Sequence, residues 1–345
     1  MDEPGGVTGP ATTAFLLHSA AALHDTGWGH PEHQGRMRSL ASTVGKDMMA
    51  LHDRVLQWEA EPADPEVYSL VHTAAHIQRV RSAVERAAAS HEIVALDADT
   101  RVSGASWEAV TGSTGALLRA LQGVADGECR RAFVASRPPG HHATADQVMG
   151  FCLFNHVAVA ARWLQREKLA ERVLIVDWDV HHGNGTQDIF YDDPSVFFCS
   201  LHQFPHWPGS GAADETGTGA GTGTTLNVPV EPGTPRGEYL DRFHAAMASI
   251  RERFQPDWIL VSSGFDAMAG DPLGNLLLEP ADFHRMTRTL VEWADEVCDG
   301  RVVALLEGGY NPSRTGQGAV AVIRGLSGAP VPDFPAVQST REEEW

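Results

Sequence analysis

Acidic and histidine side chains alternate along one short segment of the chain. Asp177, Asp179 and His181 are spaced by two residues, so an extended backbone would point all three to one side. Asp266, in the segment SSGFD, could supply another carboxylate from a neighbouring strand. Asp179, His181 and Asp266 would suit Zn²⁺ or Fe²⁺ and leave a position for water, as in a catalytic metal site. Each of these residues alone would be explained as a strand-end cap, so the prediction depends on the set.

Two adjacent histidines, His141 and His142, follow two prolines and a glycine in RPPGHH. The stiff approach favours a deliberately placed pair, with one general base and one electrostatic helper. Asp177 could orient one imidazole and Asn184 the other, and the amide would leave its partner less basic than the carboxylate does. The alternative is that one of the two histidines is purely structural.

A phenol follows two glycines in the segment EGGYN near the end of the chain. The glycines let the backbone bend sharply and approach a ligand, so Tyr310 could donate a hydrogen bond to a developing oxyanion opposite the metal. A GGY segment by itself indicates only a turn.

Short apolar runs rich in β-branched and aromatic residues surround these polar segments. Their near-continuous hydrophobicity predicts strands covered on both faces, as in a parallel sheet, and helical patterns alternate with them. The predicted strands are Arg131–Ser136, Arg172–Asp177, Val196–Ser200, Leu226–Val230, Trp258–Ser262 and Val302–Leu306, and the predicted helices are Asn155–Gln165, Glu238–Phe254, Ala281–Val297 and Pro312–Leu326.

Polar segments come directly after five of the six predicted strands. In open α/β sheets ligands bind at the carboxyl ends of the strands, so these segments should meet in one crevice. The sequence therefore predicts one wound α/β domain over residues 1–327. A short C-terminal tail, 328–345, is rich in proline and ends in REEEW.

Composition excludes several classes of protein. The 345 residues carry a formal net charge of −19, which argues against a nucleic-acid partner. No run of 18 apolar residues suggests a membrane span, and the start MDEPGG does not resemble a signal peptide, so we expect a cytoplasmic protein. The four cysteines lack paired spacing, so neither a disulfide framework nor a cysteine zinc site is expected. The oligomeric state is left open, a homo-oligomer included.

Seven motifs follow one another along the chain: RPPGHHA, GFCLFNHVAVAA, VDWDVHHGNGTQDIFY, SLHQFPHWPGSG, NVPV, SSGFDAMAGDPLG and LLEGGYN. Taken together and in this order, they resemble those of zinc-dependent histone deacetylases, in particular a bacterial member of the class II branch. The resemblance runs from about His30 to Gly325 and implies the arginase–deacetylase fold, with a parallel sheet of roughly eight strands between helices.

The resemblance also implies roles for single residues. Asp179, His181 and Asp266 would bind zinc, with Fe²⁺ as the alternative metal. His142 would be the general base, His141 the electrostatic partner linked to Asp177, and Tyr310 the oxyanion donor. Asn184 stands where the class I pattern has Asp, which places the chain in class II. K⁺ near the zinc would involve Asp177, Asp179, His181, Ser200 and Leu201, and a second K⁺ would lie around Phe190, Asp193 and Val196.

A narrow substrate tunnel is a further implication of the resemblance. Gly150 and Phe151 match one wall and Trp207 the other, while Leu273 would lie at the rim. The indole is larger than the Phe or Tyr common at that position, which predicts that long or branched acyl groups fit poorly. Asp97 or Asp99 would grip the substrate backbone, and the sequence leaves the choice between them open.

The expected activity is removal of acetyl groups from N-ε-acetyl-lysine in proteins or peptides. The first alternative is an acetylpolyamine amidohydrolase acting on a small acetylated amine, but relatives of that kind carry an acidic residue where this chain has Leu273. A ureohydrolase such as arginase needs a two-metal cluster that the motifs do not match. An inactive module that binds acetyl-lysine is disfavoured because all catalytic positions are intact.

Overall fold

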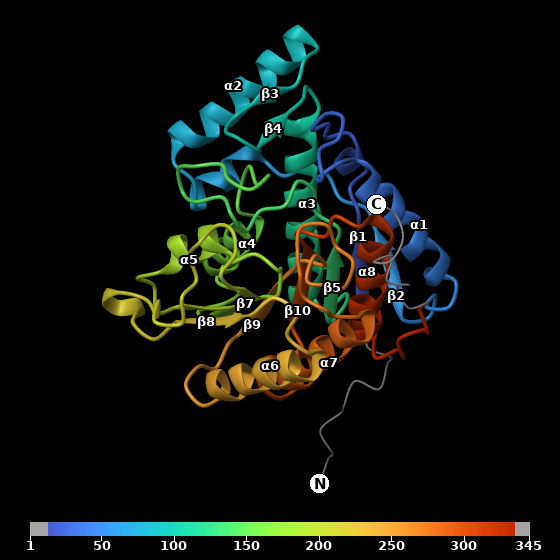
Figure 1. Ribbon diagram of the computed structural model, residues 1–345, viewed down its shortest axis with the longest axis vertical. Helices are drawn as coiled ribbons and strands as arrows, with labels where there is room; N and C mark the ends of the chain where they lie inside the picture. The colour runs from blue at the N-terminus through green and yellow to red at the C-terminus, as the bar shows by residue number, and fades with distance from the viewer. Residues whose placement is uncertain (1–12, 335–345) are drawn as a thin grey trace, which may run out of the picture.

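A parallel sheet of eight strands forms the centre of the computed structural model, which describes residues 13–334 (Figure 1). The strands lie in the order β2-β1-β5-β10-β9-β6-β7-β8. Their bounds are β1 Thr13–Leu16, β2 Val55–Trp58, β5 Arg131–Val134, β6 Val173–Asp177, β7 Val196–Gln203, β8 Thr225–Val230, β9 Trp258–Ser263 and β10 Val302–Leu306, while β3 (Val94–Ala95) and β4 (Arg101–Val102) form a separate antiparallel pair.

Helices cover both faces of this sheet and enclose two hydrophobic cores. One core lies under α1 (Gly35–Met48), α6 (Arg236–Arg251), α7 (Pro280–Val297) and α8 (Pro312–Ser327). The other lies under α2 (Ala74–Ser90), α3 (Ser106–Ala125), α4 (His156–Arg166) and α5 (Asn184–Phe190).

Side chains of each central strand alternate between the two cores. In β6, Leu174 and Val176 enter the first core, whereas Val173 and Ile175 enter the second. Because successive side chains of a strand point to opposite faces, an apolar run without polar interruptions is what a sheet covered twice requires.

All six predicted strands and all four predicted helices are present, with ends that differ by a few residues. Strand β7 continues to Gln203, three residues beyond its predicted end. The sequence reasoning identified neither β1 nor β2, and it did not single out α1, α2, α3 or α5.

The described part of the predicted C-terminal tail packs against the domain. Helix α8 ends at Ser327, where Gly328 takes a left-handed conformation. The carbonyl of Ala329 accepts a hydrogen bond from His284 at 2.9 Å, and Val331 and Phe334 pack on the first core. Residues 335–345 lie outside the described residues, so the division at residue 327 stays a prediction.

The four cysteines are buried and free. Among the helices within residues 13–334, none combines the length and the apolar character needed to cross a membrane.

Several histidines are buried in the folded protein. Burial lowers the pKa of His72 to about 3, and it lowers the pKa values of His24 and His156 to about 4. His156 lies under the segment RPPGHH, with hydrogen bonds to Thr114 at 3.0 Å and to the carbonyl of Pro138 at 3.2 Å. These rings are therefore neutral in the folded state at neutral pH.

We expect this burial to make the protein less stable in mild acid. Between about pH 7 and pH 5 the unfolded chain takes up a proton at each such histidine, whereas the folded chain does not. The free energy of unfolding therefore falls by roughly 2 kcal/mol per histidine. His141 has a raised pKa and offsets part of the effect. Urea unfolding of His156→Gln at both pH values should show a smaller loss of stability than the wild type shows. The control is His52→Gln, because His52 is exposed. If His156→Gln lost as much stability between pH 7 and pH 5 as the wild type loses, His156 would not be neutral in the folded protein.

Candidate active site

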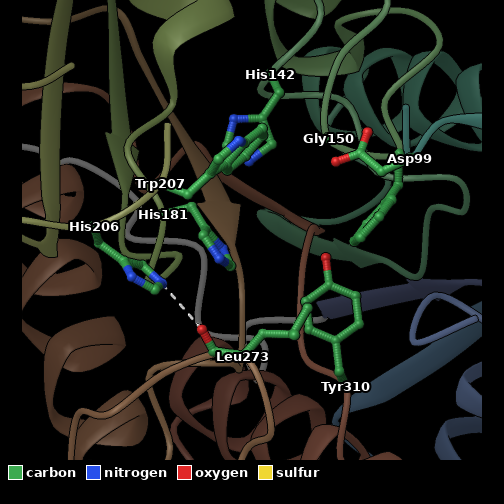
Figure 2. Close-up of a pocket in the computed structure, with 9 residues that line it drawn as sticks. Asp99, His142, Gly150, His181, His206, Trp207, Leu273 and Tyr310 are labelled. Carbon is green, nitrogen blue, oxygen red and sulfur yellow. Dashed lines mark hydrogen bonds between the residues drawn. The ribbon is translucent and has the colours of Figure 1, made fainter. Parts of the chain in front are cut away.

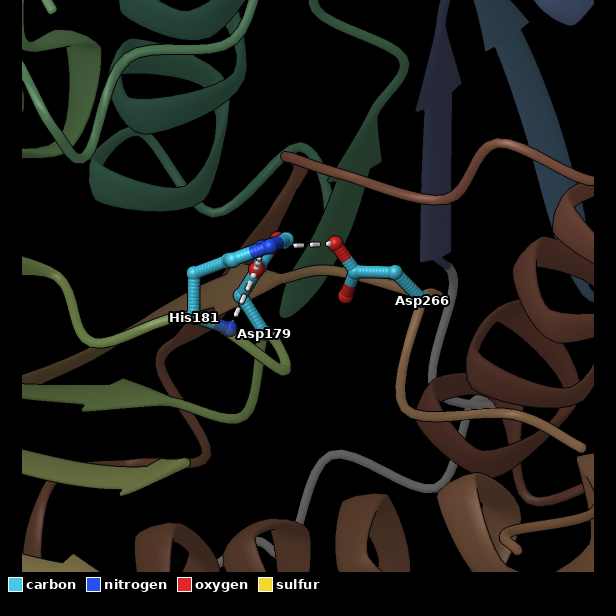
Figure 3. Close-up of side chains that lie close together, drawn as sticks. All are labelled: Asp179, His181 and Asp266. Carbon is cyan, nitrogen blue, oxygen red and sulfur yellow. Dashed lines mark hydrogen bonds and ion pairs between the residues drawn. The ribbon is translucent and has the colours of Figure 1, made fainter. Parts of the chain in front are cut away.

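The carboxyl ends of five neighbouring strands, β5, β10, β9, β6 and β7, carry the polar segments noted in the sequence. Asp179 and His181 follow β6, and Asp266 follows β9, the adjacent strand. One ligand atom of each lies within 4.8 Å of the others, and all three residues are buried. His181 lies between the two carboxylates, with Nδ1 at 3.1 Å from Asp179 Oδ1 and 3.2 Å from Asp266 Oδ2 (Figure 3).

The cluster has the character of a metal site. Asp266 Oδ2 is buried and has no hydrogen-bond donor besides the ion-pair partner His181, whereas Oδ1 accepts a hydrogen bond from the backbone of Val180 at 2.8 Å. Burial and the nearby charge of Asp179 raise the pKa of Asp266 to about 7. A cation between the carboxylates would relieve both the desolvation and the repulsion, and two carboxylates with one imidazole suit Zn²⁺ or Fe²⁺.

A glycine after β10 lets two strands bring their acids together. The backbone N–H of Gly308 donates to Asp179 Oδ2 at 2.8 Å. A Cβ atom on Gly308 would collide with both Asp179 and Asp266. The glycines of the segment EGGYN were expected to let the backbone approach a ligand, and in the structure this backbone lies against the carboxylates of Asp179 and Asp266.

The two adjacent histidines have different acceptors. His141 Nδ1 lies 2.9 Å from Asp177 Oδ2, and His142 Nδ1 lies 2.7 Å from Asn184 Oδ1. Since an amide oxygen only accepts, Nδ1 of His142 carries the proton and Nε2 keeps its lone pair.

Their surroundings drive the two pKa values apart. Burial alone would lower the pKa of His141, but the carboxylates of Asp177 and Asp179 outweigh it and raise that pKa to about 10. Burial lowers the pKa of His142 well below its ordinary value, and positive charge on His141 lowers it further. The pair therefore combines a charged imidazole, His141, with a neutral one, His142. This is the combination that an electrostatic partner and a general base require.

A cavity of about 220 Å³ opens above these groups. In Figure 2, His142, Trp207 and His181 lie on one side of it, and Tyr310 points its phenol oxygen into it from the other. The four residues predicted to bind substrate all line it. Its full lining is Asp99, His142, Gly150, Phe151, His181, His206, Trp207, Leu273 and Tyr310.

Aromatic rings shape the cavity into a narrow passage. The Trp207 ring lies edge-on to His142, with centroids 4.7 Å apart, and the Phe151 ring lies edge-on to Tyr310 at 5.7 Å. Gly150 lets the chain pass close to two of these rings, because a Cβ atom at this position would come within 2.5 Å of both His142 and Trp207.

Phe151 itself has a positive φ of 69°, which is unusual for a bulky residue. Its backbone N–H donates to Thr100 Oγ1 at 3.1 Å, which helps to hold the strained conformation. The strain places the ring in the wall of the cavity, as is common where a site requires one orientation.

Tyr310 is held from the backbone and from beneath its ring. Its N–H donates to Asp271 Oδ2 at 2.6 Å, and the guanidinium of Arg36 lies 4.9 Å from the ring centroid. Arg36 is fixed by hydrogen bonds to the carbonyls of Glu307 and Gly309, both at 2.6 Å, and by an ion pair with Glu32 at 2.9 Å. The phenol thus has a set position over the cavity floor.

The two acidic residues before β4 have different surroundings. The carboxylate of Asp97 turns back to accept hydrogen bonds from the backbone of Asp99 at 3.0 Å and of Thr100 at 2.5 Å. Asp99 instead lines the cavity (Figure 2). Of the two residues between which the sequence left the choice open, Asp99 is the one that can reach a ligand.

Two residues in or under the site were missed in the sequence. His206 stacks on His181 with centroids 5.0 Å apart and bonds the carbonyl of Leu273 at 3.0 Å. Its position directly before Trp207 was the available signal. Glu307 is fully buried and accepts hydrogen bonds from the backbone of Gly140 at 2.7 Å and of His141 at 3.2 Å. It fixes the backbone from which both histidines project.

The residues predicted for the first K⁺ site lie together next to the cluster. Asp177 and Ser200 are register partners across β6 and β7, and Leu201 follows in β7. The hydroxyl of Ser200 bonds His202 Nδ1 at 2.9 Å.

The residues predicted for the second K⁺ site connect α5 to β7. The N–H of Asp193 donates to the carbonyl of Phe190 at 3.1 Å, and Val196 begins β7. The Asp193 carboxylate is already paired with Arg162 at 2.6 Å, so a K⁺ there would depend on backbone oxygens. Both K⁺ sites stay predictions.

Comparison with known proteins agrees with this geometry. Residues 30–326 match the family model described as "Histone deacetylase domain". The chain is 38% identical over 319 residues to the histone deacetylase-like amidohydrolase of Pseudomonas aeruginosa, covering 90% of this chain and 82% of that protein. A probable deacetylase of Archaeoglobus fulgidus is 34% identical over 299 residues, covering 87% of this chain and 81% of the relative.

A solved structure supports the same relationship. The crystal structure of the HDA15 HD domain superimposes with a TM-score of 0.86 at 35% identity, covering 95% of this chain and 91% of that one. The sequence-based resemblance and the expected sheet of roughly eight parallel strands are confirmed. The chain belongs to the histone deacetylase family of amidohydrolases and has the arginase–deacetylase fold.

Proposed function

We propose that the protein is a zinc-dependent hydrolase that removes the acetyl group from N-ε-acetyl-lysine in proteins or peptides. The observation that carries the proposal is a narrow cavity with aromatic walls whose lining includes His181, which forms a cluster with Asp179 and Asp266. An apolar passage suits the four-carbon stem of lysine and excludes water from the acetyl group at its end.

Asp179, His181 and Asp266 would hold the metal ion, Zn²⁺ or Fe²⁺. A divalent ion there would polarise the acetyl carbonyl and acidify a water molecule. The buried oxygen of Asp266, which has no partner besides His181, and the raised pKa of its carboxyl support this assignment. We also assign the two K⁺ sites to their predicted residues, on the resemblance to the family.

The side chains around the cavity supply the remaining chemistry. His142 has a free Nε2 lone pair and is neutral, so it would accept a proton from the attacking water. Tyr310 would donate its phenol proton in a hydrogen bond to the carbonyl oxygen as negative charge develops there. His142 or His141 would then protonate the departing lysine amine, so that the products are acetate and lysine.

Acetylpolyamines are the rival substrates, because they would use the same catalytic groups. Leu273 lines the cavity and offers no charge to a distal ammonium. Asp99 lines it too and is the specific observation in favour of the rival. The net charge of −19 attracts any polycation, but that field is spread over the surface and screened within about 10 Å at ordinary salt.

We therefore expect a higher kcat/KM for an acetyl-lysine peptide than for acetylspermidine. Leu273→Glu should move the ratio towards the polyamine on the order of five-fold, because a rim carboxylate would pair with the distal ammonium. Leu273→Gln is the matched control without the charge. Both efficiencies are measured on all three proteins, with bound metal quantified. A wild type that already prefers the polyamine would favour the acetylpolyamine amidohydrolase activity and would indicate that Asp99 pairs with the distal ammonium.

A further inference from the structure

An exposed tryptophan, Trp28, lies two residues before His30, whose ring contacts Phe151 in the cavity wall. Trp28 is 103% exposed, the highest value among the large exposed hydrophobic residues of the described chain. Large apolar side chains left in water commonly belong to a binding surface, and tryptophan is enriched at the centres of interfaces. The indole takes no part in the active site described above.

The turn that carries it, residues 25–30, is firmly held. Gly27 and Gly29, on either side of the indole, have φ values of 95° and 74°. The N–H of Gly27 donates to Asp25 Oδ1 at 3.0 Å, and the hydroxyl of Thr26 donates to the carbonyl of Glu32 at 2.6 Å. Since the backbone of the turn is ordered before any partner arrives, little backbone conformational entropy is lost when the indole makes a contact.

The same turn ends at the cavity wall. The ring of His30 lies edge-on to Phe151 with centroids 4.8 Å apart, and its Nε2 lies 3.0 Å from the carbonyl of Asp99. Trp28 precedes His30 by two residues, so their Cα atoms are within about 7 Å. A segment that leaves the cavity on this side would pass the indole.

Negative charge around the turn favours the binding of a cationic group. The carboxylates of Asp25, Asp97 and Asp99 belong to the turn and to the adjoining loop. The guanidinium of Arg101, which donates to the carbonyl of Thr26 at 3.4 Å, lies beneath Gly27 and offsets one of them. An indole face in a negative surrounding attracts an ammonium or guanidinium group through cation–π and ion-pair terms.

We infer that Trp28 is a specificity residue that binds an Arg or Lys side chain near the acetyl-lysine of a peptide substrate. The inference rests on the proposed function, since it requires the acetyl-lysine to enter the cavity. It narrows the substrate class to acetylated peptides with a basic neighbour.

The test compares peptides with one isolated substrate. Acetyl-lysine peptides carry Arg, Leu or Glu at the two positions on either side, and the isolated substrate is N-ε-acetyl-lysine with both ends blocked. The wild type should prefer Arg at one or more positions. Trp28→Ala should lower kcat/KM for those peptides by about two- to five-fold and leave the isolated substrate unchanged. Trp28→Phe should keep most of the preference, and Met49→Ala, an 84% exposed residue at the end of α1, is the surface control.

Each other outcome has a definite meaning. Equal losses for Arg, Leu and Glu peptides, or no loss for any, would overturn the role of Trp28 while leaving the deacetylase proposal intact. A change of oligomeric state of Trp28→Ala in size-exclusion chromatography, without a change in peptide preference, would assign the indole to a contact between copies and overturn the inference. Failure of the wild type to hydrolyse any acetyl-lysine substrate would overturn the proposed function, and this inference with it.

Discussion

Tyr310→Phe should lower turnover by roughly two to three orders of magnitude, the usual effect of removing one oxyanion donor. The substitution deletes the phenol oxygen that enters the cavity but leaves the ring against Phe151 and over Arg36. Binding of substrate and of a hydroxamate inhibitor should therefore survive, and so should the metal content. Single-turnover kinetics and hydroxamate titration separate the two effects.

The matched control for this experiment is Tyr68→Phe. Tyr68 is fully buried and bonds Thr114 at 2.9 Å, away from the cavity, so its variant tests the loss of a phenol oxygen as such. Near-normal turnover in Tyr310→Phe would make Tyr310 a turn residue and would remove the oxyanion donor from the proposal.

Asp266→Ala should abolish both metal binding and activity. Only three protein ligands are available in the cluster, so the loss of one carboxylate removes a third of the donors and leaves His181 without one of its two acidic neighbours. Asp179→Ala should have the same effect. Metal content is measured by mass spectrometry of the purified proteins, beside hydrolysis of an acetyl-lysine peptide.

Asp188→Ala serves as the control, because that carboxylate is exposed and lies outside the cluster. Circular dichroism shows whether Asp266→Ala is folded. Retention of stoichiometric zinc by a folded Asp266→Ala would contradict the assignment of the metal ligands.

The central sheet was predictable because its strands are covered on both faces and therefore have continuous apolar sequences. Strand β1 is buried and has the apolar sequence AFL, so it carries the signal and was overlooked, although β5, of the same length, was identified. Strand β2 lacks the signal because it lies at the edge of the sheet, where Leu56 is 41% exposed. An edge strand has fewer buried neighbours, so its sequence is less constrained to be apolar.

The site was predictable as far as motifs at strand ends determine it. Residues whose position depends on loop conformation were not. Asp97 and Asp99 have the same side chain, and only the hydrogen bonds of Asp97 within its turn tell them apart. Glu307 contacts the backbone of a segment about 165 residues earlier, and such a long-range contact leaves no spacing to recognise.

The position of β10 has a consequence for how the chain matures during synthesis. The last strand in sequence lies between β5 and β9, at the centre of the sheet. Until it leaves the ribosome, the nascent chain can form at most two separate half-sheets, each with an unpaired edge. The segment that brings Tyr310 to the cavity follows directly after this strand. We therefore expect closure of the sheet and completion of the proposed active site to be one late event in synthesis.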